Sequence, residues 1–447
     1  MSTENPRPLD GVRVFELSIA IAGPMCGRNL AHFGAEVIKV ESRKNPDVIR
    51  LLGAGWIPRA DVGDAWGDCG PVANEFMGGK KSIGVDLKAP EAKEIARRLI
   101  TECDVFLTNY STPAVRALGF GYEAVSAIKP DIVYASVSGF GTDVGTPYYD
   151  FIAWGPNQAP LVGLDDMTGW PDRPQSGFSS FAYPDFSNSF HATVAVLAAL
   201  EHRDRTGEGE FIEISQQEAT AAMFGPWLVD AQRGKPPKRD GHHDPDYAPH
   251  ALYPCRGNDR WVAITIASDD EWRRFAEAAG HREWIDDSRF ATGAARLENQ
   301  DTLDEAISAW TRPQCEEAIA EHLQRAGVTA APLLDNPRVA LDPQLRSRRF
   351  WLLPEHARFG RDFVTGCPIV LSDTPGHLDR GAPSVGQDND EVLGGLCGYS
   401  AAEIAALVER GVVYPMARPE LRLERRYLSW LKHFLPDLDW PTPGARP

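Results

Sequence analysis

Strand and helix patterns alternate over the first 140 residues, and this order constrains the fold more than any other feature of the chain. Pro24 suits the first turn of a helix, and Gly34 suits its end. Segments rich in β-forming residues predict strands at 12–17, 36–40, 105–107 and 132–137. Because parallel strands require helical crossovers, the order predicts an α/β fold. We expect a large Rossmann-like domain with a parallel sheet that helices cover on both faces.

The segment that begins at Pro90 supports this prediction. Its apolar residues recur at the spacing of one helical face: Ala92, Ile95, Ala96, Leu99 and Ile100. Such a stripe is typical of a helix that packs on a sheet. The pattern also predicts helices at 185–202 and 401–409 and a strand at 211–215.

The middle of the chain has a different character. Residues 141–184 are rich in Gly, Pro, Trp and Tyr, and they predict long loops that form a pocket. A polar segment at 235–250 predicts a linker, and the strand and helices expected after it lie at 260–266, 270–279 and 314–326. We therefore predict a large domain at 1–234 that resumes at 336–413, a smaller α+β domain at 251–335, and a C-terminal extension at 414–447.

Composition excludes several classes of function. The chain has 46 Lys+Arg against 63 Asp+Glu, and its net charge of −17 argues against binding to nucleic acid or an anionic membrane. An anionic small ligand is still compatible, since a pocket needs only a few local cations. Seven cysteines without a CxxC pair indicate reduced thiols. Without a signal peptide or a long apolar run, the protein is expected to be cytoplasmic.

Common catalytic motifs are missing from the sequence. We find no GxGxxG, Walker, HExxH or GxSxG pattern. The histidines and aspartates between His242 and His250 lie in a proline-rich segment without helical or strand spacing. We therefore predict no metal site there.

Asp185 is the most informative single residue, because it stands at the start of the apolar helix predicted at 185–202. One interpretation is an ordinary N-cap, in which the carboxylate accepts a hydrogen bond from a free N–H group of the helix. The other is catalytic: a helix N-terminus keeps a carboxylate ionised and available as a nucleophile. The residues alone leave both interpretations open.

Several strings of the chain, taken together, resemble the class III CoA-transferases, the formyl-CoA transferase or CaiB–BaiF family. They are PLDGVRV (8–14), AGP (22–24), GAEVIKVE (34–41), KSI (81–83), DVFLTN (104–109), SGFG (138–141), RTGEG (205–209) and GV (327–328). The similarity runs in order from about residue 8 to residue 413. In that family the catalytic aspartate begins the helix before the Arg-Thr-Gly segment, and here that position is Asp185.

The resemblance implies transfer of CoA from an acyl-CoA donor, such as succinyl-CoA, to a carboxylic acid. Asp185 would attack the donor to give an aspartyl anhydride, and the CoA thiolate would then give an aspartyl-CoA thioester. An acceptor acid would repeat the steps in reverse. CoA thioesters are substrates in this scheme, and no permanently bound cofactor is implied. The loops of 141–184 would keep water from the intermediates.

The resemblance also implies a set of residues that bind CoA. They are Ile21, Ala22, Arg43, Lys80, Lys81, Asn109, Tyr110 and Phe140. Three features depart from the family pattern. Ile21 replaces a glutamine, which makes an oxalate-sized acceptor doubtful; Ala117 replaces an arginine; and the segment from His242 to His250 lies where formyl-CoA transferase has a glycine-rich loop.

Two other functions fit the same fold. Racemases of this superfamily pair the aspartate with a histidine on the preceding loop, but the matching stretch YYDF (148–151) has none, which favours transfer. A non-catalytic subunit is the other alternative, and the presence of Asp185 argues against it. The motifs YPD (183–185) and YPC (253–255) are similar to a subgroup that acts on aryl-substituted succinates, although the acceptor itself stays open.

The resemblance implies an interlocked dimer, either of two identical chains or with a related second chain. The linker at 235–250 and the return of the chain after Pro332 fit that topology. Residues 421–435 of the C-terminal extension carry apolar residues at helical spacing. This stripe packs either on its own subunit or on the partner.

Overall fold

The computed structural model describes residues 6–52, 59–174, 182–361 and 363–423. The chain divides into two compact units. The first comprises residues 1–164, 178–235 and 344–447, and the second comprises 165–177 and 236–343. Most of the segment predicted as a linker thus belongs to the second unit.

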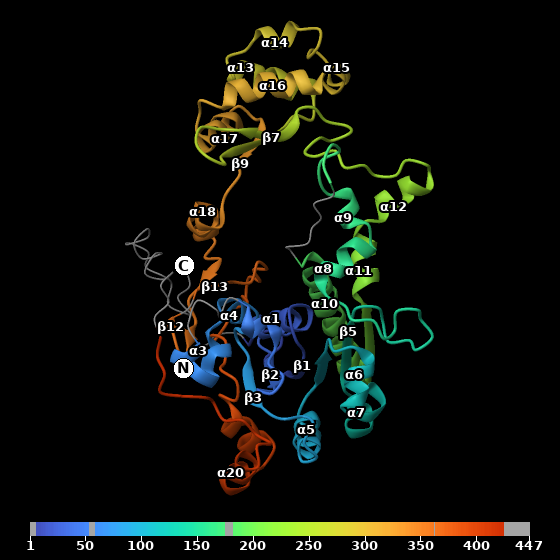
Figure 1. Ribbon diagram of the computed structural model, residues 1–447, viewed down its shortest axis with the longest axis vertical. Coiled ribbons are helices and arrows are strands. Elements are labelled where there is room, and N and C mark those ends of the chain that lie inside the picture. Colours follow the sequence, from blue (N-terminus) through green and yellow to red (C-terminus); the bar gives the residue numbers. More distant parts are fainter. Residues whose placement is uncertain (1–5, 53–58, 175–181, 362, 424–447) are drawn as a thin grey trace. The chain divides into compact units, whose positions relative to one another are not determined.

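The first unit is built on a six-stranded parallel sheet in the order β3-β2-β1-β4-β5-β6 (Figure 1). The strands are β1 Arg13–Leu17, β2 Glu36–Glu41, β3 Lys81–Gly84, β4 Val105–Thr108, β5 Val133–Ser138 and β6 Glu210–Ser215. The predicted α/β fold with a parallel sheet is confirmed. The chain adds β2 and β3 on one side of β1 and then returns to place β4 on its other side. This reversal makes the gap between β1 and β4 the topological switch point of a doubly wound sheet.

Apolar side chains alternate between the two faces of this sheet, as the period of a strand requires. Phe15, Ile38 and Phe106 belong to one buried cluster, and Val14, Val37 and Val105 belong to another. The first cluster includes residues of α5 Ala92–Thr101, α7 Tyr122–Ile128 and α20 Ala401–Glu409. The second includes residues of α1 Ala22–His32 and α10 Tyr183–Thr206. Helices therefore cover both faces, as predicted.

Other elements of the first unit are shorter. They are α2 Val48–Leu51, α3 Arg59–Val62, α4 Pro71–Met77, α6 Thr112–Ala117, α8 Gly155–Leu161, α11 Gln216–Met223, α12 Gly225–Gln232 and α19 Pro343–Ser347, which crosses its boundary. Two small hairpins pair β10 Trp351–Leu352 with β13 Val364–Thr365 and β11 Glu355–His356 with β12 Gly360–Arg361. The interpretation of 141–184 as loops was wrong in part. It missed α8 and α9 Leu164–Met167, because helices this short carry no measurable periodicity.

The second unit has a mixed α/β architecture of its own. Its antiparallel sheet has the order β7-β8-β9, formed by β7 His250–Pro254, β8 Trp261–Thr265 and β9 Thr329–Pro332. Its helices are α13 Asp269–Ala278, α14 Glu283–Asp286, α15 Gly293–Glu298, α16 Gln300–Thr311, α17 Glu316–Arg325 and α18 Asn336–Leu341. Trp272, Phe275 and Trp284 stand in its buried core. Among the described residues, no helix has the length and apolar character needed to cross a membrane.

Candidate active site

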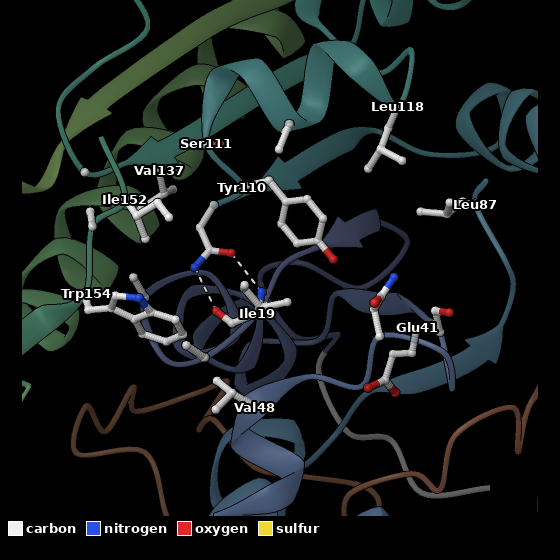
Figure 2. A pocket seen from close by; sticks show the side chains of 18 of the residues that line it. Ile19, Glu41, Val48, Leu87, Tyr110, Ser111, Leu118, Val137, Ile152 and Trp154 are labelled. Atoms are coloured by element: carbon white, nitrogen blue, oxygen red, sulfur yellow. Dashed lines mark hydrogen bonds between the residues drawn. The ribbon is translucent and has the colours of Figure 1, made fainter. Parts of the chain in front are cut away.

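A pocket of about 710 Å³ lies at the carboxyl edge of the six-stranded sheet (Figure 2). Every strand contributes to its lining a residue one or two positions beyond the strand's end: Ile19, Ser42, Asp86, Asn109, Gly139 and Gln216. Doubly wound sheets bind ligands in the crevice outside the carboxyl ends of their strands, at the switch point. The pocket therefore lies where this fold places a ligand site.

Asn109 joins the two loops that meet at the switch point. Its Oδ1 accepts a hydrogen bond from the Ile19 backbone N–H at 2.8 Å, and its Nδ2 donates to the Ile19 carbonyl at 2.8 Å. Both bonds are drawn in Figure 2. Gly23 permits this approach, since a Cβ there would come within 3.0 Å of Asn109 Cγ. The loop after β1 is thus fixed to the loop after β4 by a single side chain.

Buried charged side chains also fix the loop after β1. Lys39 Nζ donates to the Ser18 carbonyl at 2.6 Å, and Asp47 Oδ1 accepts from the Ala20 N–H at 2.8 Å. Ala20 has φ +59°, a left-handed conformation that costs a residue with a Cβ some strain. Lys39 is fully buried, and its ammonium lies 3.3 Å from Glu16 and 3.2 Å from Asp47. The network of buried charges therefore offsets the strain at Ala20.

Asp185 stands at the third position of α10, and its carboxylate lines the pocket. Gln216 Nε2 donates to Asp185 Oδ1 at 2.7 Å, and the Gly155 backbone N–H also bonds the carboxylate. The N-cap residue of α10 is Ala182, so Asp185 lies inside the first turn and is not the N-cap of this helix. Burial raises the pKa of Asp185 to about 6, and the two hydrogen bonds oppose that rise. The carboxylate is therefore ionised at neutral pH and is held by neutral donors.

Apolar residues form the wall of the pocket at this end. Figure 2 shows Val137, Ile152 and Trp154 on one side of Tyr110, with Leu87 and Leu118 on the other. Ile152 is 74% exposed and Trp154 is 45% exposed, which is unusual for side chains of this type. Among the described lining residues Lys88 is the single cation. The pocket thus has apolar residues on this side, and its charged lining residues besides Asp185 are Glu41, Asp86 and Lys88.

The structure brings together some of the predicted site residues. Ala22, Asn109, Tyr110 and Asp185 all line the pocket. Ile21 lies beside it and packs in an apolar cluster that includes Phe186. These residues come from α1, the end of β4 and α10, so the tertiary fold assembles them from distant parts of the chain.

The predicted cations lie elsewhere. Lys80 is fully buried, where its Nζ contacts Glu16 at 2.7 Å and the Pro24 carbonyl at 2.7 Å, and burial lowers its pKa to about 8. Lys80 is not among the described residues that line the pocket, and its predicted role in binding CoA stays a prediction. Lys81 pairs with Glu36 and Glu391, and Arg43 donates to the Pro415 carbonyl.

Phe140 is also outside the pocket lining, but it supports a residue that belongs to it. Its ring packs 5.3 Å from that of Tyr148 and 6.3 Å from that of Phe151, and Phe151 lines the pocket. Sequence reasoning missed Gln216 and Lys88. The available signal for Gln216 was its position, since it is the first residue after the strand predicted at 211–215.

The histidine-rich segment is part of a hydrogen-bonded network. His243 Nε2 lies 2.8 Å from Asp304 Oδ2, and the Tyr253 hydroxyl donates to Asp304 Oδ1 at 2.6 Å. Within the described ranges, the side chains whose ligand atoms lie close enough together to hold a metal ion are Cys315, Glu316 and Glu317. Arg338 pairs with both of these glutamates at 2.7 Å, and its charge opposes cation binding.

The fold and the pocket together are typical of an α/β enzyme with a ligand site at the switch point of a doubly wound sheet. Residues 9–389 match the model of CoA-transferase family III, and the chain belongs to that family. It is a CoA-transferase, an enzyme class whose substrates are CoA thioesters. The resemblance inferred from the sequence is confirmed.

Curated relatives cover nearly the full chain. A succinyl-CoA–D-citramalate CoA-transferase of Chloroflexus aurantiacus is 33% identical over 92% of this chain and 100% of its own length. A succinate–glutarate CoA-transferase of Agrobacterium fabrum is 30% identical over 86% of this chain and 95% of its own. Among solved structures, a CAIB/BAIF family protein from Brucella suis has a TM-score of 0.78 at 29% identity, over 88% of this chain and all of its own.

Proposed function

We propose that this enzyme transfers CoA from a succinyl-CoA-like donor to a carboxylic acid, with Asp185 as the nucleophile. The observation that carries the proposal is the Asp185 carboxylate itself. It lines the pocket at the strand ends, it is held by Gln216 and Gly155, and its pKa of about 6 leaves it ionised at neutral pH. An ionised carboxylate without a cationic partner keeps its electron pairs available for attack.

The proposed reaction has two halves. Asp185 Oδ2 bonds the acyl carbon of the donor, the C–S bond breaks, and CoA leaves as a thiolate. The thiolate sulfur then bonds the aspartyl Cγ and expels the donor acid as a carboxylate, which leaves an aspartyl-CoA thioester. An acceptor carboxylate reverses both steps and receives the CoA. The sequence needs no ATP, because the thioester energy is conserved in each intermediate.

Two observations support the proposed substrates, one from the relatives and one from the pocket. The relatives from Chloroflexus and Agrobacterium are named for succinyl-CoA and succinate, which supports a succinyl donor. The apolar lining of Val137, together with the exposed side chains of Ile152 and Trp154, supports an acceptor with an apolar or aryl substituent, such as an aryl-substituted succinate. We place the acyl end at this wall and the rest of CoA toward Tyr110 and Lys88. Direct phosphate contacts by Arg43 and Lys81 stay predictions.

Trapping of the covalent intermediate tests this proposal. After mixing with succinyl-CoA, hydroxylamine or borohydride should modify the peptide that contains Asp185, as read by mass spectrometry. A modification found only on a cysteine, for instance the buried Cys26, would indicate a different covalent route. Because burial raises the pKa of Cys26 to about 12, we expect no reaction there.

The family resemblance and the surface also support a dimer, with an identical or a related chain as partner. Helix α10 exposes Phe190, Val194 and Leu197, which recur on one face, and α12 has no buried residue although it carries Trp227 and Leu228. Exposed apolar faces of this kind are typical of subunit interfaces. Sedimentation at submicromolar concentration should show a dimer, and a monomer would contradict the interlocked form.

The beginning of the C-terminal extension packs on its own chain. Leu421 and Leu423 contact the buried cluster of Val62, Cys69 and Phe359. The remaining part of the predicted apolar stripe, 424–435, lies outside the described residues. The location of that part stays a prediction.

A further inference from the structure

Gln216 is the side chain that contacts the reactive carboxylate directly, and its position is well fixed. It is 5% exposed and is the first residue of α11, immediately after β6. The Ser215 hydroxyl caps the helix by accepting from the Glu218 N–H, and the Gln216 carbonyl accepts from the Thr220 hydroxyl at 2.7 Å. The amide group therefore projects from an anchored backbone to Asp185 Oδ1.

The two oxygens of Asp185 lie in different surroundings. Oδ1 accepts the 2.7 Å hydrogen bond from Gln216 Nε2. Oδ2 lies over Gly155, where a Cβ would come within 2.1 Å of it. A residue larger than glycine at 155 would therefore displace this oxygen. The arrangement assigns Oδ1 to the Gln216 amide and places Oδ2 beside Gly155, whose backbone N–H also bonds the carboxylate.

We propose that Gln216 is a second catalytic residue, which donates its amide N–H to Asp185 Oδ1 while that oxygen carries the charge of the tetrahedral intermediate. The inference rests on the proposed function above. When the CoA thiolate bonds the aspartyl Cγ, the electron pair of the C=O bond moves to Oδ1. When the carbonyl re-forms, the bond from Cγ to Oδ2 breaks and the acid leaves with Oδ2. No proton is transferred in either step.

The charge on Oδ1 changes through these steps, and that change makes the hydrogen bond catalytic. In the anhydride and the thioester Oδ1 is a neutral carbonyl oxygen, whereas in the tetrahedral intermediate it bears a full negative charge. A fixed donor therefore binds the transition state more strongly than either covalent intermediate. Removal of one such donor typically lowers the rate by about 10²- to 10³-fold.

If Gln216 only supports the resting carboxylate, its removal should have the opposite effect on the reaction rate at high pH. If the amide only stabilised the resting carboxylate, its loss would raise the pKa of Asp185 and make the ionised form a more basic nucleophile. Above that pKa the reaction would then proceed at the same rate or faster. Donation to the intermediate predicts a slower reaction at every pH, including those at which Asp185 is fully ionised.

The test measures how fast the CoA adduct forms on the enzyme after mixing with succinyl-CoA, by rapid quench and intact-protein mass spectrometry from pH 5 to 9. Gln216→Leu removes the donor, and Gln216→Met serves if the leucine variant does not fold. Gln217→Leu is the matched control, because the next residue of a helix points about 100° away. Binding of a non-reactive CoA thioether to each variant separates affinity from chemistry.

We expect the Gln216 variants to bind the thioether as the wild type does and to form the adduct at least about 100-fold more slowly at pH 8.5. The Gln217 variant should match the wild type. An adduct rate for both Gln216 variants that equals or exceeds the wild-type rate at pH 8.5 would overturn the inference. Absence of any CoA adduct on the wild type would instead overturn the proposed function, and the role of Gln216 with it.

Discussion

Two carboxylates of the first unit, the fully buried Glu16 and the partly buried Asp185, have different partners. Glu16 is fully buried in β1 between two lysines, with Lys80 at 2.7 Å and Lys39 at 3.3 Å, and it accepts from the Ser18 hydroxyl at 2.6 Å. Asp185 is half-buried and has an amide and a backbone N–H as partners. One carboxylate is compensated by charge, and the other is held by neutral dipoles.

This difference separates structure from chemistry. Buried opposite charges at contact distance fix each other's position and have little reactivity left. A carboxylate held by neutral donors can be placed accurately and still keep its electron pairs and its raised pKa. The Glu16 network supports the loop that forms one wall of the pocket, whereas Asp185 lies inside the pocket.

The largest expected effect is on activity at Asp185. Asp185→Ala should lower CoA transfer by roughly 10⁴-fold or more, the range seen when a covalent nucleophile is removed. Binding of a CoA thioether should persist, since the alanine leaves the remaining lining in place. Transfer close to the wild-type rate would show that the two carboxylates do not differ as argued. The measurement is a transfer assay with succinyl-CoA and a panel of acids.

The next effect is on stability at Glu16. Glu16→Ala leaves two buried lysines without their shared partner and should lower the free energy of unfolding by about 3–5 kcal/mol. Glu94 is the matched control, because it also pairs with two cations, Arg97 and Arg98, but is 45% exposed. Glu94→Ala should cost no more than about 1 kcal/mol. Urea unfolding of both variants checks the contrast, and equal losses would contradict it.

The same contrast explains how far the sequence alone could predict this protein. Local patterns predicted the strands and helices of the sheet, because the periods of β1 and α5 are written in consecutive residues. The position of Asp185 at the start of an apolar helix was also visible, and the family resemblance gave it a role. Both features depend on neighbours in the chain.

What the sequence could not supply depends on contacts between distant residues. Lys80 looks like a surface lysine, and its burial follows from the pairing with Glu16, 64 residues away. Gln216 reaches Asp185 across 31 residues because β6 ends beside α10. The strand β3 was missed as well, because Ile83 is its one apolar side chain and its place in the sheet comes from pairing with β2. Charges and hydrogen bonds acquire their roles from the tertiary fold, which periodicity does not encode.

The smallest of the three effects is the loss of folding stability caused by the charged Asp185 side chain. Its pKa is raised from 3.8 to about 6 in the folded state, chiefly by burial, so the folded protein binds this proton more tightly than the unfolded chain does. The wild type therefore loses stability as pH rises from about 4 to about 6, and the loss is complete above that range. A rise of this size corresponds to at most about 3 kcal/mol.

Asp185→Asn removes the charge with little change of shape. Its carbonyl oxygen can still accept from Gln216, although its amide nitrogen cannot accept from the Gly155 N–H. At pH 7–8 the free energy of unfolding of the variant, measured with urea, should therefore exceed that of the wild type by up to about 3 kcal/mol. The variant has nevertheless lost its activity. The advantage should shrink through pH 6 and vanish below about pH 4, where both states of the wild type are protonated. A constant difference across this range would mean that packing, not charge, sets the gain. An advantage that follows the titration would show that the enzyme keeps a destabilising carboxylate at the position where it needs a nucleophile.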